Sequence, residues 1–290
     1  MNGLQKWLQF FERISCFYIH RFMNPLWNNQ YRNHLNNLQD SICLFLAGYA
    51  FERNLNPQTR NRWAQIAVQS VQQAFNQHNG RWNSQIISQV WNTFNNQISK
   101  SNAKANPLAP RGTPCGGNRS TNQLSFLEAI NLVPTIINSS FTEFIRQQIS
   151  HGNFLLVYGY LTQINGINDK IASFFLRDFL EVFQIEIYPD EREILAQPVD
   201  THVREVINKL NNLLKLGLPL VKDLEFKVFI VSNARKFRLN PRKINMGMWY
   251  FRSQVLNGGR VQFPTLNKAL NLCNNHRRTL PVNIRNVCQC

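Results

Sequence analysis

The chain has 290 residues, of which 43% are hydrophobic and 12% aromatic, so it can bury a sizeable core and is not a disordered chain. Thirty-two Lys and Arg residues stand against 16 Asp and Glu, which gives a formal net charge of +16 and a sequence pI near 10.0. This excess indicates a polyanionic partner, nucleic acid first and an acidic membrane surface second, although charge can also serve solubility alone.

Neither a membrane-spanning helix nor an export signal is visible in the sequence. The most apolar stretch, residues 42–51, is about half as long as a spanning helix. Residues 1–7 lack the charged region followed by an apolar core that marks a secretion signal. We therefore expect an intracellular protein, in the cytoplasm and nucleoid or in a nucleus. Its cysteines are expected to be reduced thiols, with Cys16 and Cys43 buried.

The first predicted helices follow one another along the N-terminal part of the chain. Apolar residues recur at helical spacing from Trp63 to Phe75, after the start signals Pro57 and Thr59, and again over residues 86–98. A third helix is predicted over residues 141–149, where Ser140 and a Glu three residues later form a capping box. Period-two alternation is limited to residues 225–229, which a helix explains equally well, so the fold class is all-α.

Residues 101–123 interrupt this pattern with Pro and Gly among polar residues and are predicted to be a loop or linker. The chain then divides into an N-terminal helical block (1–100), a block that carries the chemistry (124–215) and a C-terminal helical block (216–290). Residues 187–193 are predicted to be an inserted turn.

A helical hairpin is the most informative feature of the middle block. The apolar residues 154–161 and the helical face over residues 171–183 flank a tight turn at Gly166. Asn168 is predicted at a second turn position that needs left-handed backbone, which Asn tolerates better than most residues. Such a turn points backbone N–H groups outward at the start of the second helix, where the helix dipole favours phosphate.

A second signal lies about thirty positions further on. Residues 197–206 read Gln-Pro-Val-Asp-Thr-His-Val-Arg-Glu-Val, in which Asp200 is predicted to cap a helix that starts at Thr201.

Together the two stretches resemble the helix-hairpin-helix DNA glycosylases, over roughly residues 120–210. Members carry Leu-Pro-Gly-Val/Ile-Gly-x-Lys followed by Ala, and later Val-Asp-Thr/Val-His-Val. Here residues 164–172 read Ile-Asn-Gly-Ile-Asn-Asp-Lys-Ile-Ala, and residues 198–203 read Pro-Val-Asp-Thr-His-Val. Asn165 and Asn168 stand where the family has Pro and a second Gly, and Asp169 adds an acid.

The resemblance implies a two-lobed helical fold with a cleft between the lobes, and a monomer that acts on double-stranded DNA carrying a damaged base or an abasic site. The enzyme flips a damaged, probably oxidised, base out of the duplex and cuts its bond to the sugar. Lys170 would be the nucleophile that forms a Schiff base and allows β-elimination, and Asp200 would stabilise positive charge on the sugar. The DNA-binding residues implied are Asn165, Gly166, Ile167, Asn168 and Lys170. No cofactor is implied, apart from a monovalent cation at the hairpin.

Alternatives remain at both catalytic positions. Lys170 could be a phosphate contact and Asp200 only a helix cap, which would make the protein a DNA-binding protein of the same fold without catalysis. A helical adaptor whose basic face meets an acidic protein or lipid is a third hypothesis.

Three further groups were weighed near the C-terminus. Trp249 and Phe251 are candidates for stacking on an extruded base, although an aromatic cluster is more often core. The basic run 235–243 could follow a phosphate backbone. No metal is predicted; the weaker alternative is a zinc site, whose ligands would be Cys273, His276, Cys288 and Cys290.

Overall fold

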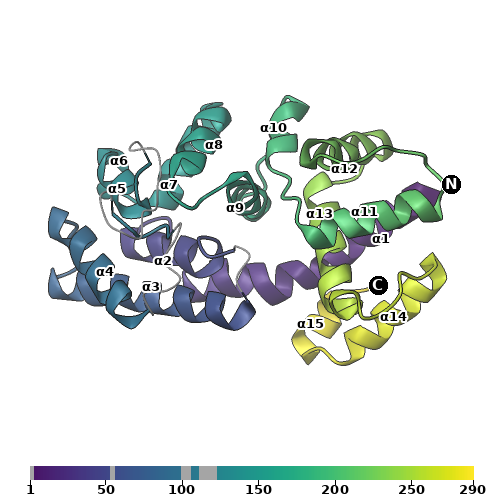
Figure 1. The fold of residues 1–290 in the computed structure, drawn as a ribbon, viewed down its shortest axis with the longest axis horizontal. Helices are drawn as coiled ribbons and strands as arrows, with labels where there is room; N and C mark the ends of the chain where they lie inside the picture. Colours follow the sequence, from purple (N-terminus) through teal and green to yellow (C-terminus); the bar gives the residue numbers. More distant parts are fainter. Residues whose placement is uncertain (1–2, 53–55, 99–105, 111–122) are drawn as a thin grey trace. The chain divides into compact units, whose positions relative to one another are not determined.

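The computed structural model describes residues 3–52, 56–98, 106–110 and 123–290, and within these ranges every regular element is a helix. Figure 1 shows their arrangement. The all-α prediction is confirmed, whereas the cleft between lobes stays a prediction. No helix in the described ranges combines the length and apolarity that crossing a membrane requires. The helices are α1 Gly3–Tyr18, α2 Leu38–Gly48, α3 Pro57–Gln77, α4 Ser84–Gln97, α5 Phe126–Asn131, α6 Pro134–Ile137, α7 Phe141–Ser150, α8 Phe154–Gln163, α9 Asp169–Val182, α10 Asp190–Leu195, α11 Thr201–Leu213, α12 Asp223–Phe237, α13 Pro241–Tyr250, α14 Leu266–Arg278 and α15 Val282–Val287, with π-helical turns η1 Ile19–Met23, η2 Pro25–Gln30 and η5 Phe251–Val255 and the 3-10 turn η6 Asn257–Gly259.

The predicted helices are confirmed, and their ends are set by local hydrogen bonds. Asn56 caps α3 by accepting from the Thr59 N–H, and Pro57 is the first helical residue. Ser140 caps α7 by accepting from the Glu143 N–H at 2.9 Å. The Glu143 carboxylate does not complete the predicted capping box, because it forms an ion pair with Arg146 instead.

The chain folds into two compact units, and they do not follow the predicted blocks. Unit 1 combines residues 1–25 with 176–290, and unit 2 comprises residues 26–175. The N-terminal helix thus belongs with the C-terminal block, and one unit boundary falls within α9 rather than at the linker. Most of the predicted linker lies outside the described residues. Its described part, 106–110, is largely buried in unit 2, where the Pro107 carbonyl accepts from the Phe126 N–H at 2.7 Å.

Unit 1 is built on the pairing of α1 with α13. Gly247 makes this pairing close: a Cβ there would lie 1.9 Å from the Phe11 carbonyl oxygen. Aromatic rings continue the contact, because Phe251 lies 5.3 Å from Phe10 and 5.9 Å from Phe11, between ring centroids. The absence of a side chain at one position therefore allows the two backbones to approach.

Unit 2 buries a second aromatic core. Phe45 of α2 lies 4.6 Å from Phe126 and 5.2 Å from Phe175, and Phe175 stacks on Trp27 at 5.8 Å. Each of these rings is fully buried. This core holds the start of α9, and with it the predicted hairpin, against α2 and α5.

The predicted inserted turn is partly helical. Residues 187–189 are irregular, and α10 starts at Asp190. Glu193 on α10 is buried, and its Oε1 accepts from Gln197 at 3.0 Å.

Candidate functional site

The α8–α9 hairpin is present in unit 2, and its turn is fixed by backbone hydrogen bonds. Gly166 has a φ of 77°, and the Ile167 N–H donates to the Ile164 carbonyl at 3.0 Å. The Asn165 N–H donates to the Leu124 carbonyl at 2.7 Å, which ties the turn to the segment before α5. The left-handed backbone at Gly166 is the feature that a side chain would oppose.

Asn168 is the N-cap of α9, and the prediction that it adopts a left-handed backbone is wrong. Its φ is not among the positive values, its Oδ1 accepts from the Ile171 N–H at 3.1 Å, and its carbonyl accepts from the Ala172 N–H at 3.0 Å. The Asn side chain thus satisfies a first-turn N–H group, a role that Gly cannot perform.

The side chains of two other predicted DNA contacts point into unit 2. Asn165 is 4% exposed, and its Nδ2 donates to the Asn106 carbonyl at 3.0 Å; Ile167 is 3% exposed. Any contact with DNA at these two positions would therefore go through the backbone. In the described ranges the N–H groups of Gly166, Asn168 and Lys170 have no acceptor.

Asp169 is turned toward α8. Its Oδ1 accepts a short hydrogen bond from the Tyr158 hydroxyl and lies 3.5 Å from the Ser173 Oγ. Burial, and then the bond to Asp169, raise the pKa of Tyr158 well above its usual value, so this hydroxyl stays a donor. The acid that departs from the family pattern is therefore engaged by the hairpin itself.

Lys170 is the second residue of α9 and is half-buried. Within the part of the chain that the structure describes, its amine has neither a carboxylate partner nor a hydrogen bond. A lysine held in this way at a helix start suits either contact with a phosphate or attack on a carbon atom.

Asp200 caps α11 in unit 1, as predicted. Its Oδ1 accepts from the Val203 N–H at 2.9 Å, and its side chain is half-buried. Lys170 and Asp200 thus belong to different units, and each is placed only within its own.

A buried polar network, which the sequence did not indicate, holds the segment before Asp200. The Arg177 guanidinium donates to Asp178 at 2.7 Å, to the Tyr18 hydroxyl at 2.6 Å and to the Asn245 Oδ1 at 2.8 Å. Asn245 in turn donates from Nδ2 to the Pro198 carbonyl at 2.9 Å. Every side chain of the network is at most 3% exposed, so α1, α9 and α13 together fix the backbone two residues before Asp200.

The two aromatic stacking candidates differ in exposure. Phe251 is fully buried, so its ring offers no face to a base, which corrects that part of the prediction. Trp249 is half-buried, and its ring lies 6.2 Å from His202 and 5.6 Å from both Tyr18 and Phe22. Phe22 is 36% exposed, so Trp249 and Phe22 present aromatic surface beside the first turn of α11.

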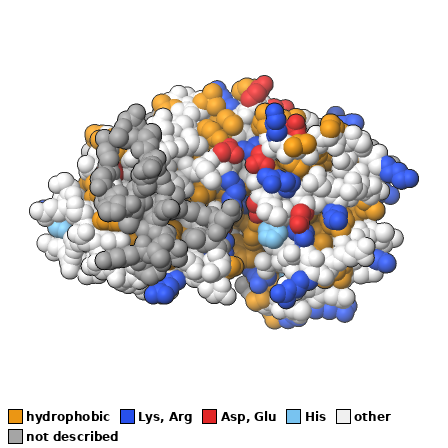
Figure 2. Space-filling view, viewed as in Figure 1, with side chains coloured by type: hydrophobic (Ala, Val, Ile, Leu, Met, Phe, Trp, Pro, Cys, Tyr) orange, Lys and Arg blue, Asp and Glu red, His pale blue; other side chains and the backbone are white. Residues whose placement is uncertain are grey.

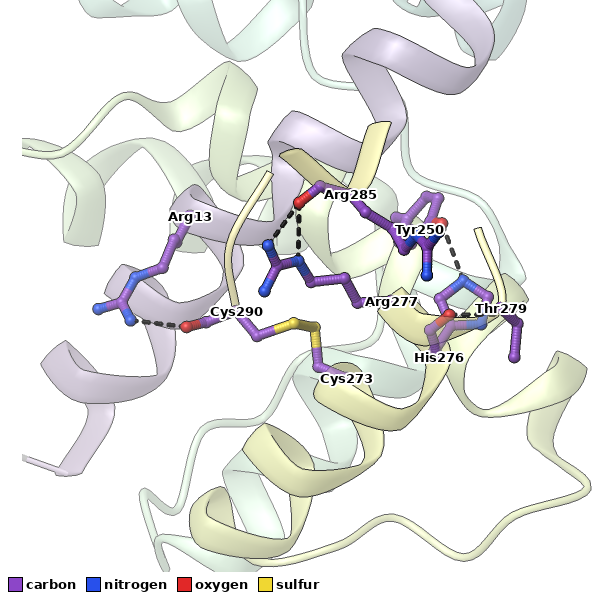
Figure 3. Close-up of a disulfide and its surroundings, with 8 residues drawn as sticks. All are labelled: Arg13, Tyr250, Cys273, His276, Arg277, Thr279, Arg285 and Cys290. Carbon is purple, nitrogen blue, oxygen red and sulfur yellow. Dashed lines mark hydrogen bonds between the residues drawn. A yellow bond between two sulfur atoms is a disulfide. The ribbon is translucent and has the colours of Figure 1, made fainter. Parts of the chain in front are cut away.

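The C-terminal cysteines form disulfides, so the expectation of reduced thiols is wrong for four residues. Cys273 pairs with Cys290, and Cys16 pairs with Cys288, with Cα–Cα distances of 5.9 and 5.5 Å that fit disulfide bonds. The sulfurs of the hypothetical zinc set are therefore bonded to other cysteines. His276 accepts or donates a hydrogen bond with the Tyr250 hydroxyl at 2.9 Å, beside the Cys273–Cys290 bond (Figure 3).

Two other cysteines and one histidine complete this group. Cys43 is a buried free thiol, as predicted, and Cys115 lies outside the described residues. The ligand atoms of His20, Cys16 and Cys288 lie within 4.8 Å of one another. Because the two sulfurs are joined, this cluster holds one available ligand and is not a metal centre in this state.

The basic run 235–243 is largely neutralised by acids of unit 1. Arg235 pairs with Asp190 at 2.9 Å, Arg242 lies 3.5 Å from Glu193, and Lys243 lies 3.4 Å from Glu181. Arg242 is also buried. These cations serve the packing of α12 and α13 and are poorly placed to follow a phosphate backbone.

Comparison with known proteins gives one relative and no family. No family model matches the chain, and no solved structure matches it significantly. The chain is similar to an uncharacterized protein of Methanocaldococcus jannaschii, with 27% identity over 292 residues that include 86% of this chain. The chain spans 66% of that protein's length, just under two thirds. The argument about function therefore depends on the residues described above.

Proposed function

We propose that the protein is a DNA base-excision enzyme: an N-glycosylase that removes a damaged, oxidised base and nicks the resulting abasic site. The α8–α9 hairpin would hold the DNA backbone, Lys170 would be the nucleophile and Asp200 the electrostatic partner. The observation that carries this proposal is the hairpin itself, in which an unpaired lysine amine lies beside backbone N–H groups that have no acceptor among the described residues.

The hairpin suits the binding of a phosphate. Helix N-termini attract anions through their unpaired N–H groups and the helix dipole. At the start of α9 the Asp169 carboxylate would oppose an anion, and its hydrogen bonds to Tyr158 and Ser173 reduce this effect. The net charge of +16 favours the approach of DNA.

The chemistry assigned to Lys170 proceeds by covalent catalysis. The Nζ lone pair attacks the sugar C1′, and the C1′–N bond breaks, so that the base leaves with the bonding electrons and a proton. Ring opening gives an imine between C1′ and Nζ. Loss of a C2′ proton then expels the 3′ phosphate, and water releases the lysine.

Asp200 would stabilise the positive charge that develops on the sugar, while its bond to the Val203 N–H fixes its position. Trp249 is the remaining candidate for stacking on the extruded base, since its ring is partly exposed.

The test is reductive trapping with sodium borohydride on a duplex that contains an abasic site. We expect a covalent protein–DNA adduct with the wild type and with Lys209→Ala, a control at an exposed lysine of α11. Lys170→Ala should give no adduct. If wild type and control give none either, the lyase activity is refuted.

Asp200→Asn separates catalysis from capping, because Asn is as good an N-cap as Asp but lacks the charge. We expect base excision to slow at least about 100-fold while the stability of α11 is kept. Equal rates for Asp200→Asn and wild type would leave Asp200 as a cap alone.

A DNA-binding protein without catalysis is the second candidate. The position of Lys170 at a helix start favours it, since a cation there also suits contact with a phosphate. Salt-sensitive DNA binding that Lys170→Ala weakens, without any trapped adduct, would identify this function.

A further inference from the structure

The C-terminal part of the chain carries an unusual excess of positive charge. Residues 226–290 contain twelve of the 32 Lys and Arg residues and no Asp or Glu. Several of the twelve, such as Arg235 and Arg242, pair with acids from earlier segments of unit 1. The cations of α14 and α15 do not, and in the face of the molecule seen in Figure 2 this region shows Lys and Arg without acidic side chains.

These helices enclose an open pocket of about 630 Å³. It is lined by Arg277, Arg278 and Arg285 together with four asparagines of the same two helices, and by no acidic or apolar residue. Guanidinium and carboxamide groups donate hydrogen bonds in the geometry that phosphate oxygens accept. A second pocket of unit 1, of about 440 Å³, also contains arginines but includes Glu186 and Glu193.

The pocket is held in shape by the chain around it. Arg277 donates through Nε to the Arg285 backbone carbonyl at 3.0 Å, which links α14 to α15 (Figure 3). The Cys273–Cys290 disulfide joins the middle of α14 to the last residue, and Arg13 of α1 donates to the Cys290 carbonyl at 2.9 Å. The side chains of Arg278 and Arg285 have no acceptor among the described residues.

We infer that this pocket is a second binding site for the phosphate groups of double-stranded DNA, separate from the hairpin. A cavity of that size with three arginines and no acid fits backbone phosphates and offers no apolar surface for a protein partner. The choice of DNA as the source of the phosphates rests on the proposed function. The pocket positions DNA and takes no part in chemistry.

The test is the salt dependence of binding to an undamaged duplex, measured by fluorescence anisotropy from 50 to 200 mM NaCl. The variant is Arg278→Gln with Arg285→Gln, which keeps the backbone carbonyl that Arg277 uses. The control is Arg260→Gln with Lys209→Gln, two exposed cations of unit 1 outside the pocket. Thermal unfolding of each protein confirms that it is folded.

Two lost phosphate contacts should reduce the slope of log K against log salt by about 1.8. The affinity lost across this salt range should then be about twelvefold smaller in the variant than in wild type, whereas the control should match wild type. Equal slopes in variant and control would overturn the site.

Two further arms identify the source of the phosphate. A larger effect of the variant on duplex RNA than on DNA would overturn the assignment to DNA. So would 10 mM inorganic phosphate, at matched ionic strength, if it removed the difference between variant and wild type. Borohydride trapping at saturating DNA should be the same in the variant as in wild type, so a failed pocket and a failed lyase are told apart.

Discussion

Asn245 joins two buried polar groups that no other described residue connects. Its amide oxygen accepts from Arg177 and its amide nitrogen donates to the Pro198 carbonyl, each over less than 3 Å. Arg177 is 1% exposed and needs these acceptors, because an unpaired charge in the interior is costly. The residue therefore stabilises unit 1 and fixes the segment that leads to Asp200.

Asn245→Ala should lower the free energy of unfolding by about 1–3 kcal/mol, because a guanidinium donor and a buried carbonyl lose their partners. Asn233→Ala is the control, since it removes one local hydrogen bond, to the Phe229 carbonyl, and should cost less than about 1 kcal/mol. Urea unfolding measures both. Equal losses in the two variants would contradict the role of the network.

If Asn245 also positions Asp200, base excision by Asn245→Ala should slow at temperatures where the variant is fully folded. The change is expected in kcat with little change in KM, since the residue contacts no substrate in the proposal. An unchanged kcat would limit Asn245 to stability.

His34 makes the stability of unit 2 depend on pH. Burial disfavours the imidazolium and lowers the pKa of His34 to about 4. The unfolded chain, with a pKa near 6.5, takes up this proton first as the pH falls. The contribution of His34 is thus complete above about pH 6.5 and is lost as the pH falls toward 4.

We expect the wild type to lose about 2.5 kcal/mol more stability than His34→Gln between pH 7.5 and pH 4.5. Urea unfolding at the two pH values gives the difference. The same pH dependence in both proteins would show that His34 does not titrate as its burial requires.

At the scale of the elements, individual helices could be predicted, because their signals are local. The apolar periodicity of α3 and the caps at Asn56 and Ser140 involve residues within one or two turns. Asn168 shows the limit of a family pattern: the resemblance suggested a left-handed turn residue, whereas its own side chain caps α9.

The pairing of helices could not be predicted in the same way. The contact of α1 with α13 depends on Gly247 and Phe11, which lie far apart in the sequence, and a glycine within a helix carries no mark of its partner. This pairing is why the N-terminal helix belongs to unit 1 and why the predicted blocks were misplaced.

Gly247→Ala should disrupt this pairing, because its Cβ would meet backbone atoms of Phe11 that cannot move aside alone. We expect a loss of about 3 kcal/mol, seen as a lower midpoint in thermal unfolding followed by circular dichroism.

The control is Gly159→Ala in α8, where a Cβ would meet nothing within 4 Å. It should raise stability by about 0.5–1 kcal/mol, the usual gain from Ala in a helix interior. Similar effects of the two substitutions would contradict the close approach of α1 and α13.

At the scale of the whole molecule, the net charge indicated a polyanion but not where it would bind. The structure divides the cations into those paired with acids, such as Arg242 and Lys243, and those left open, such as Arg278. The conspicuous basic run 235–243 belongs to the first class. Charge along a sequence cannot show this division, since the acids that pair with the run come from earlier segments.

Cysteine pairing was likewise invisible to the sequence, because the Cys16–Cys288 bond spans a separation of 272 residues. Thiol titration of the denatured protein without reductant should find at most two reactive thiols, those of Cys43 and Cys115, and six after reduction. Reduction should lower stability by about 2–5 kcal/mol. Six reactive thiols before reduction would contradict both disulfides.

The central claim is that Lys170 attacks the sugar of damaged DNA, and the most direct measurement identifies the trapped amino acid. Wild-type protein is reduced with borohydride on a duplex that contains an abasic site, digested with nuclease and protease, and analysed by tandem mass spectrometry. We predict a single sugar-modified peptide that carries the modification on Lys170. A modification on another lysine or on the terminal amine, or no modified peptide, would contradict the claim.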